Sequence, residues 1–415
     1  MKNLHDQERR DVLLNLYSRA LAVVNGRHCV ASFLSDHPLP AKKVRVIAIG
    51  KAASSMLQGA LDSCIHAIEA GLIITKDGHL DDLGTVDIPV EKMESGHPYP
   101  DRRSLAAGRL LLDFIAQMPA ETGVLFLLSG GASALVEVLP EGVTVEKLDQ
   151  LNRWLLARGW PIDQMNRIRK SVSCIKAGRL ARYLKQHDVM QLLISDVPRD
   201  DLSVIGSGLL IPDAQPAVVS EPLPAWIVDM QSAVPSAPMA GDSCFAKIQT
   251  RLIASNAILR AEVERLARTA GFAVQCNRVL EGDAARQGRQ IAQALRDGQP
   301  GIYIWGGESV VTLPEQPGQG GRCQHLALAA AQALAGHAGI SVLAVGSDGT
   351  DGPGDTAGAL IDGGTLERAQ DAGAGSADSA LRRADAGRFL DAAGDLIDTG
   401  PTGTNVMDLI IGLKN

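Results

Sequence analysis

Short apolar runs alternate with longer amphipathic stretches along the whole chain. Nine of the apolar runs are typical of strands, at residues 44–50, 71–75, 123–131, 189–196, 250–256, 272–280, 301–308, 341–349 and 407–413. Most are apolar at consecutive positions, which indicates strands buried on both faces. Stretches such as 101–118 and 259–271 have the spacing of amphipathic helices. This order predicts an α/β fold with parallel sheets covered by helices.

A proline-rich stretch divides the chain. Residues 210–242 contain six prolines and little periodicity, which is typical of a linker or a surface crossing. The length of 415 residues favours two domains. We therefore predict a first domain over residues 1–235 and a second over residues 243–415.

Composition narrows the class of protein. A net charge of −7 and an aromatic content of 3% argue against nucleic-acid binding, which favours a basic face and stacking aromatic side chains. Six cysteines without a CxxC pair indicate reduced thiols in a cytoplasmic protein. The charged N-terminal stretch is typical of an amphipathic helix rather than a signal peptide, and no apolar run is long enough to span a membrane.

Two cations stand where a strand or a glycine-rich loop meets the start of a helix. Lys51 follows the strand at 44–50, and Arg322 follows the glycine-rich loop 318–321. A cation is mildly unfavourable at this end of a helix. A bound polyanion would explain both residues, because its oxygens would meet backbone N–H groups and a cationic side chain together.

Further polar groups follow other strands. The turn Ser129–Gly130–Gly131 could hold an anion with its N–H groups, and Asp196, Asp348, Asp351 and Asp355 lie in acidic loops. These carboxylates would suit an anion only with a divalent metal between them. The pattern favours nucleotide-dependent phosphoryl transfer, although each group also fits an ordinary turn, cap or solvated side chain. No GxxxxGK[ST] loop occurs, and no GxGxxG follows a strand.

Ten motifs together resemble a known family. The chain reads, in order, AIGKAA, SGHPYPD, SGGASAL, NRIRKSVSCIKAGRLA, LLISDVPRDDLSVIGSG, IASN, GGES, GQGGRCQHLAL, GSDGTDGPGDTAGA and TGPTGTNVMDLII. This order resembles the class II glycerate kinases, the glycerate 2-kinases with a C-terminal MOFRL domain. The resemblance covers nearly the whole chain.

The resemblance implies a Rossmann-like parallel sheet in the first domain, a MOFRL-type α/β domain after it, and an active site in the cleft between them. It implies transfer of phosphate from ATP, with Mg²⁺, to the 2-hydroxyl of D-glycerate. The family's active-site lysine and arginine fall on Lys51 and Arg322, which also bind substrate together with His97. Residues expected to bind the nucleotide are Gly50, Ser129, Gly130, Gly131, Ser133, Asn256, Gly306, Gly307 and Glu308. Asp196 is expected to accept the hydroxyl proton or to hold Mg²⁺, with Asp348 and Asp351 as further metal ligands.

The chain departs from the family pattern at a few positions. Cys323 and His325 stand where the family commonly has asparagine and glutamate, Ser171 where it has histidine, and Ala177 where it has glycine. Three other readings stay open: an oxidoreductase of the hydroxypyruvate reductase type, a kinase of another small hydroxy acid, and a non-catalytic sensor of an acidic metabolite. Both a monomer and a homodimer are compatible with the sequence.

Overall fold

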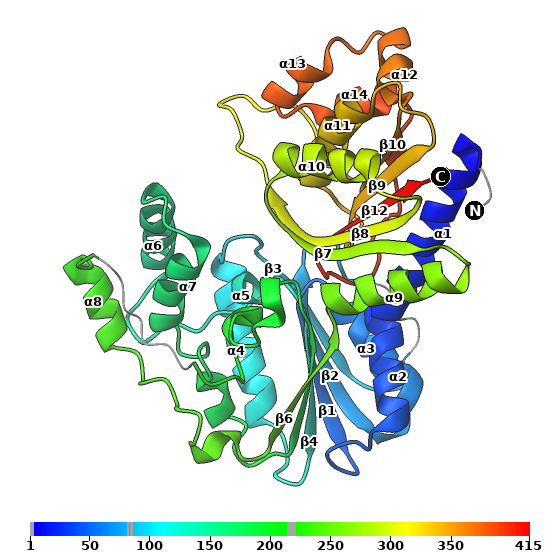
Figure 1. Cartoon of the computed structure of the whole chain (residues 1–415). Helices are drawn as coiled ribbons and strands as arrows, with labels where there is room; N and C mark the ends of the chain where they lie inside the picture. The colour runs from blue at the N-terminus through cyan, green and yellow to red at the C-terminus, as the bar shows by residue number, and fades with distance from the viewer. Residues whose placement is uncertain (1–3, 81–82, 84–85, 214–220) are drawn as a thin grey trace. The chain divides into compact units, whose positions relative to one another are not determined.

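The structure, a computed structural model, describes residues 4–80, 83, 86–213 and 221–415. The chain forms two compact units (Figure 1). One unit is Gly26–Ile253, and the other combines Met1–Asn25 with Ala254–Asn415. We call them the first and the second unit.

The first unit is built on a six-stranded sheet in the order β3-β2-β1-β4-β5-β6. Its strands are β1 (Val44–Ile49), β2 (Ile68–Lys76), β3 (Val90–Ser95), β4 (Gly123–Leu128), β5 (Val189–Ile194) and β6 (Ile248–Ala254). The pairs β2–β3, β1–β2, β1–β4 and β4–β5 are parallel. Every residue of β4 and β5 is buried, as their continuous apolar runs predict.

Helices cover both faces of this sheet. Figure 1 shows α2 (Gly26–Asp36) and α3 (Ala53–Cys64) on one side, and α4 (Arg102–Ala116) and α5 (Ala132–Leu135) on the other. A second, smaller core lies among α6 (Val145–Ala157), α7 (Ile162–Ser171) and α8 (Ala225–Ser232). Because α8 lies within residues 210–242, that stretch is not simply a linker. Short 3₁₀ turns lie at Ile65–Ala67, Arg179–Arg182, Pro198–Asp200, Ile205–Ser207 and Ser243–Phe245.

The second unit contains a mixed sheet in the order β11-β10-β9-β12-β8-β7. Its strands are β7 (Val274–Asp283), β8 (Gly301–Val310), β9 (Ile340–Gly346), β10 (Gly358–Asp362), β11 (Leu396–Ile397) and β12 (Asp408–Lys414). Only the pair β7–β8 is parallel among the pairings described for it. The prediction of a parallel sheet is therefore wrong for this unit. The last strand, β12, lies between β8 and β9 and is antiparallel to both. A run of apolar residues does not show in which direction a strand pairs, so the sequence could not predict this arrangement.

Two groups of helices pack on the second sheet. Val342 and Ala344 of β9 share a core with α10 (Ala284–Asp297) and α11 (Arg322–Leu334). The alternate residue Ser341 contacts Arg9 of α1 (Asp6–Val24), and α1 packs on α9 (Asn256–Thr269). Since side chains alternate along a strand, the two groups cover opposite faces. The remaining helices are α12 (Thr365–Asp371), α13 (Ala377–Arg382) and α14 (Ala386–Ala392).

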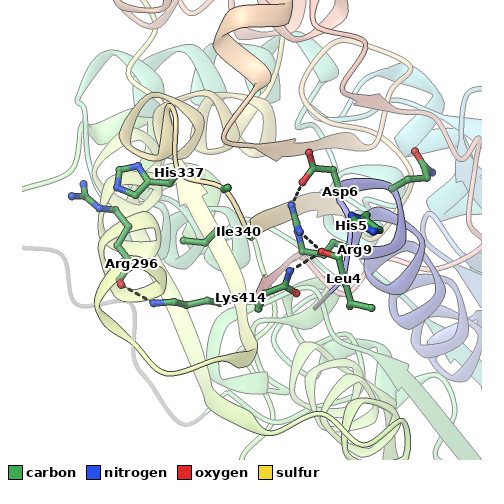
Figure 2. Close-up of a pocket in the computed structure, with 12 residues that line it drawn as sticks. Leu4, His5, Asp6, Arg9, Arg296, His337, Ile340 and Lys414 are labelled. Carbon is green, nitrogen blue, oxygen red and sulfur yellow. Dashed lines mark hydrogen bonds and ion pairs between the residues drawn. The ribbon is translucent and has the colours of Figure 1, made fainter. Parts of the chain in front are cut away.

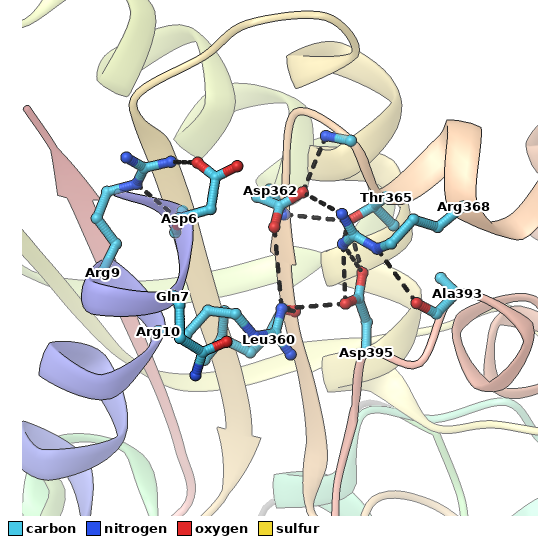
Figure 3. A network of polar contacts seen from close by, with 12 residues as sticks. Asp6, Gln7, Arg9, Arg10, Leu360, Asp362, Thr365, Arg368, Ala393 and Asp395 are labelled. Carbon is cyan, nitrogen blue, oxygen red and sulfur yellow. Dashed lines mark hydrogen bonds and ion pairs between the residues drawn. The ribbon is translucent and has the colours of Figure 1, made fainter. Parts of the chain in front are cut away.

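The two units divide the chain at other residues than the predicted ranges 1–235 and 243–415. Helix α1 packs with the second unit, where Arg10 donates to the carbonyl of Leu360 and to the carboxylate of Asp395 (Figure 3). The apolar run at 250–256, expected in the second domain, belongs mostly to β6 of the first sheet.

Candidate functional site

The carboxyl ends of the parallel strands bring four predicted site segments to one edge of the first sheet. Lys51 follows β1, His97 follows β3, Ser129 follows β4 and Asp196 follows β5. Ligands of open α/β sheets bind at this edge. Asp196 is partly buried there, directly after the fully buried Ser195.

A close approach of two chain segments fixes the backbone at Lys51. The Lys51 N–H donates to the Gly130 carbonyl at 2.9 Å, and the Ala52 N–H donates to Ser129 Oγ at 3.0 Å. Gly50 has φ +126°, and a Cβ atom at this position would collide with Ser129. Only glycine adopts this backbone next to so close a neighbour. The glycine therefore allows the turn after β4 to hold Lys51 in place.

Gly131 lies against both Lys51 and His97. A Cβ atom on Gly131 would be 3.1 Å from Cδ2 of His97 and 3.4 Å from Cγ of Lys51. The structure thus brings together the lysine, the histidine and the glycine turn that the sequence singled out. Ser133, in the short helix α5 that follows, has its Oγ 2.6 Å from Ser207 Oγ.

Arg322 lies between two carboxylates in the second unit. Its Nε and Nη2 donate to Asp408 at 2.7 and 3.0 Å, and Nη1 pairs with Glu308 at 3.0 Å. Burial lowers the pKa of Arg322, but the charges of Asp408 and Glu308 outweigh it and raise the pKa above its ordinary value. The Asp408 side chain is 2% exposed and the Arg322 side chain is 37% exposed. The buried carboxylate therefore orients a guanidinium that is partly open to solvent.

Asp408 was missed from the sequence. The only signal is a carboxylate at the start of the apolar run 407–413, where burial would require a cationic partner.

The Asp351 side chain accepts hydrogen bonds from backbone N–H groups at the N-terminus of α11. Its two carboxylate oxygens accept from the N–H groups of Cys323 and Gln324 at 3.0 and 2.7 Å. Burial raises the pKa of Asp351 to about 7, although these two hydrogen bonds oppose the rise. The sequence argument placed a ligand anion on these N–H groups. An internal carboxylate uses these two N–H groups, so a ligand anion at this helix start would meet the Arg322 side chain. Binding of such an anion stays a prediction.

Asn256 and its neighbouring glycines have structural contacts. The Asn256 amide donates to the carbonyls of Val406 and Asp408, both at 2.9 Å, and its oxygen accepts from Arg260 at 3.0 Å. A Cβ atom on Gly306 would collide with Asn256. Gly307 has φ +143°, and a Cβ atom on it would collide with the backbone of β7. Their expected roles in nucleotide binding stay predictions.

The acidic loop after β9 also has internal partners. Asp348 accepts from the N–H and the hydroxyl of Thr350 at 3.1 and 3.0 Å. Within the described ranges, no group of three or more His, Cys, Asp or Glu side chains is placed to hold a metal ion. Metal ligation by Asp196, Asp348 and Asp351 stays a prediction.

The two departures beside Arg322 lie in the interior. Cys323 belongs to the core under α10 and α11, and burial raises the pKa of its thiol. His325 is buried as well, and burial lowers the pKa of its imidazole. His325 is therefore a neutral interior side chain at neutral pH rather than a charge beside the site.

The second unit also holds a cavity of about 810 Å³ near both ends of the described chain (Figure 2). Lys414 crosses its floor and donates to the carbonyl of Arg296 at 2.7 Å. None of the residues predicted to act in catalysis or binding lines this cavity. None of the helices in the described ranges has the length and apolar character needed to cross a membrane.

Comparisons with known proteins match nearly the whole chain. The family described as a domain of unknown function (DUF4147) matches residues 12–225, and the MOFRL family matches residues 301–408. The D-glycerate 2-kinase of Thermotoga maritima is 36% identical over 382 residues, which are 89% of this chain and 90% of that protein. A putative hydroxypyruvate reductase of Agrobacterium vitis is 33% identical, over 98% of this chain and 94% of its own.

A solved structure confirms the similarity of fold. The crystal structure of the glycerate kinase of Thermotoga maritima superimposes with a TM-score of 0.85 at 32% identity, and the match covers 99% of this chain and 100% of that one. With the two matched families and this extent of identity, the chain belongs to the glycerate 2-kinase family.

Proposed function

We propose that the protein transfers the γ-phosphoryl group of ATP to the 2-hydroxyl of D-glycerate, giving 2-phosphoglycerate and ADP. The observation that supports this most directly is the placement of Lys51 against His97 and the glycine turn. Arg322, held by Asp408 and Glu308, supplies a second oriented cation. Relatives at comparable identity are named D-glycerate 2-kinase and glycerate 2-kinase.

The proposed chemistry depends on positioning and on charge. Phosphoryl transfer needs little covalent participation by the protein, and its transition state is stabilised by cations around the moving group. Lys51 neutralises oxygens of the transferring phosphoryl group, and Arg322 binds the glycerate carboxylate or the same phosphoryl group. We propose that both act on one substrate, in a cleft between the two domains.

Asp196 is the proposed acceptor of the hydroxyl proton. As the 2-hydroxyl oxygen bonds to phosphorus, the bond from phosphorus to the ADP oxygen breaks and the hydroxyl proton passes to the Asp196 carboxylate. General base catalysis contributes about 10²- to 10⁴-fold. We expect Asp196→Asn to lower kcat by a factor in this range.

The residues present fit a Mg²⁺ ion that binds together with the nucleotide. Proteins commonly hold Mg²⁺ with one or two carboxylates plus substrate phosphates rather than in a cage of side chains. Asp196 would be such a carboxylate in the alternative in which it does not accept the proton, and when bound the ion would neutralise phosphate charge. Asp351 is less suited, because both its oxygens already accept backbone hydrogen bonds.

The second candidate is reduction of hydroxypyruvate. The name of the relative in Agrobacterium vitis is the observation that favours it. The missing glycine fingerprint of dinucleotide-binding folds counts against it.

The test couples product formation to enolase without phosphoglycerate mutase, so that only 2-phosphoglycerate gives a signal. We expect a signal from D-glycerate and Mg-ATP that Lys51→Ala and Arg322→Ala abolish. Arg153→Ala is the control, because Arg153 is an exposed arginine of the first unit whose one ion pair among the described residues is with Asp149.

Two other results would change the assignment. ADP release with a different hydroxy acid would keep the kinase and change the substrate. NADH oxidation with hydroxypyruvate, with no ADP from any acid, would favour the reductase.

A further inference from the structure

The first unit contains a cavity, and most of the residues that line it have charged or polar side chains. It has a volume of about 410 Å³ and lies between one face of α7 and the loop after β5. Ser207 lines it, and Ser207 Oγ is 2.6 Å from Ser133 Oγ. Ser133 follows Gly131, which contacts Lys51 and His97. Ser207 and Ser133 therefore connect the wall of this cavity to the segment that contacts Lys51.

Three cationic and three carboxylate side chains line this cavity, and two ion pairs form among them. Lys170 pairs with Asp213 at 3.0 Å, and Arg167 lies 3.8 Å from Asp163 on the same face of α7. The remaining carboxylate, Asp201, accepts from the N–H and the hydroxyl of Ser203 at 2.9 and 2.8 Å.

Arg199 is the cation that remains. It lines the cavity, its side chain is exposed, and it has no ion pair or hydrogen bond within the part of the chain that the structure describes. An arginine without a carboxylate partner offers a planar fork of donors to an incoming oxyanion.

The backbone at Arg199 is one that an arginine adopts at a cost. Arg199 has φ 64° and ψ 10°, in the left-handed region, and Asp200 follows with φ 53°. Glycine would adopt this conformation without the clash between Cβ and the carbonyl. Since its exposed side chain gains nothing from burial, the arginine is a poor choice for folding at this position. Non-glycine residues in such conformations cluster at binding sites.

We infer that Arg199 binds an oxyanion of a substrate in this cavity and thereby sets substrate affinity. This rests on the proposed function. The oxyanion is either the carboxylate of the hydroxy acid or the phosphate of the nucleotide, because a guanidinium binds both in the same bidentate way.

The experiment uses Arg199→Gly, which removes the cation and suits the backbone. D-glycerate and Mg-ADP are titrated separately into the full-length wild type, Arg199→Gly, Arg199→Lys and the control Arg153→Ala by calorimetry. We expect Arg199→Gly to keep or raise Tm while weakening one of the two ligands by about 10- to 100-fold, the range for a lost charged hydrogen bond. Arg199→Lys should recover part of that loss, and the control should match the wild type.

The oxyanion belongs to the ligand whose binding is weakened in Arg199→Gly. Loss of glycerate binding assigns the carboxylate, and loss of Mg-ADP binding assigns the phosphate. If Arg199→Gly binds both ligands within twofold of the wild type, the inference is wrong. A weakening that Arg153→Ala shows equally would also overturn it, because it would reflect overall charge.

The result is independent of turnover. If the wild type binds these ligands but makes no 2-phosphoglycerate, the proposed function is contradicted. The titrations of Arg199→Gly would still decide whether Arg199 binds an oxyanion. An active wild type with unchanged binding in Arg199→Gly would contradict only the inference.

Discussion

Asp351 shows how a helix start is satisfied by a distant side chain. The first N–H groups of a helix have no partner within the helix. In α11 the Asp351 carboxylate accepts two of them, which fixes the turn that presents Arg322. The sequence indicated an anion at this position, and the structure places the side chain of an aspartate from the loop after β9 there. Which anion fills the position could not be predicted, because it depends on how that loop folds back.

The pKa of Asp351 predicts a pH dependence of stability. Burial raises it from 3.8 to about 7, so between these values the folded protein holds a proton that the unfolded chain has released. The stabilisation from this group is complete below the unfolded pKa and is lost as the pH rises to about 7. The free energy of unfolding should therefore fall through this window, by at most about 1.4 kcal/mol per pH unit.

The measurement compares urea unfolding of the wild type with Asp351→Asn at several pH values between about 5 and about 8. The variant should lack the part of the slope that belongs to this group. Asp398→Asn, which removes an exposed aspartate of the same unit, should keep the wild-type slope. An identical slope in the wild type and Asp351→Asn would show that Asp351 does not titrate in this range.

Among the elements, a buried ionic network links α1 to the rest of the second unit. Asp395, of which 2% of the side chain is exposed, accepts from Arg368 and Thr365 as well as from Arg10 (Figure 3). Arg10 is the only one of these donors on α1. It also donates to the Leu360 carbonyl in β10 at 2.8 Å. The network therefore ties the first helix of the chain to an edge region of the second sheet.

Arg10→Ala should destabilise the protein by about 2 kcal/mol, the range for hydrogen bonds that involve a charged group. The cost is moderate because Asp395 keeps its bonds to Arg368 and Thr365. Chemical denaturation gives the value, and proteolysis should cleave α1 faster in the variant. Arg388→Ala is the control: its side chain is 60% exposed and lies 3.7 Å from Asp385, and ion pairs of exposed side chains contribute about 0–1 kcal/mol. Equal effects of the two substitutions would contradict the role of the network.

The elements that the sequence predicted best are those with the strongest patterns. The runs at 44–50 and 189–196 correspond to β1 and β5, and 101–118 corresponds to α4. The strands that were missed, β3, β10 and β11, are short or carry charged residues along an edge. Their place in a sheet is decided by pairing with neighbours rather than by their own residues.

For the whole molecule, the sequence identified the family and the two cations but not which residues make up each unit. Lys51 was found because a lysine directly after a buried strand is unusual. The assignment of residues 1–25 to the second unit could not be found this way, since an amphipathic helix shows which face it buries and not what it packs against. The position of β12 between β8 and β9 likewise depends on pairing with strands that are distant in the sequence.

We expect the protein to become more compact when both substrates bind. Lys51 belongs to the first unit and Arg322 to the second, so a kinase that uses both must hold the two units together around its substrates. In many enzymes, loops or domains close over bound substrates and exclude water before reaction. We expect the radius of gyration from small-angle scattering to decrease with a non-hydrolysable ATP analogue plus D-glycerate, and to decrease less with either alone. Arg322→Ala should keep its ligand-free profile and show less of the decrease. If the profile stays unchanged with both ligands at saturating concentration, the two cations do not need a closing motion, and transfer would have to occur in the ligand-free arrangement of the units.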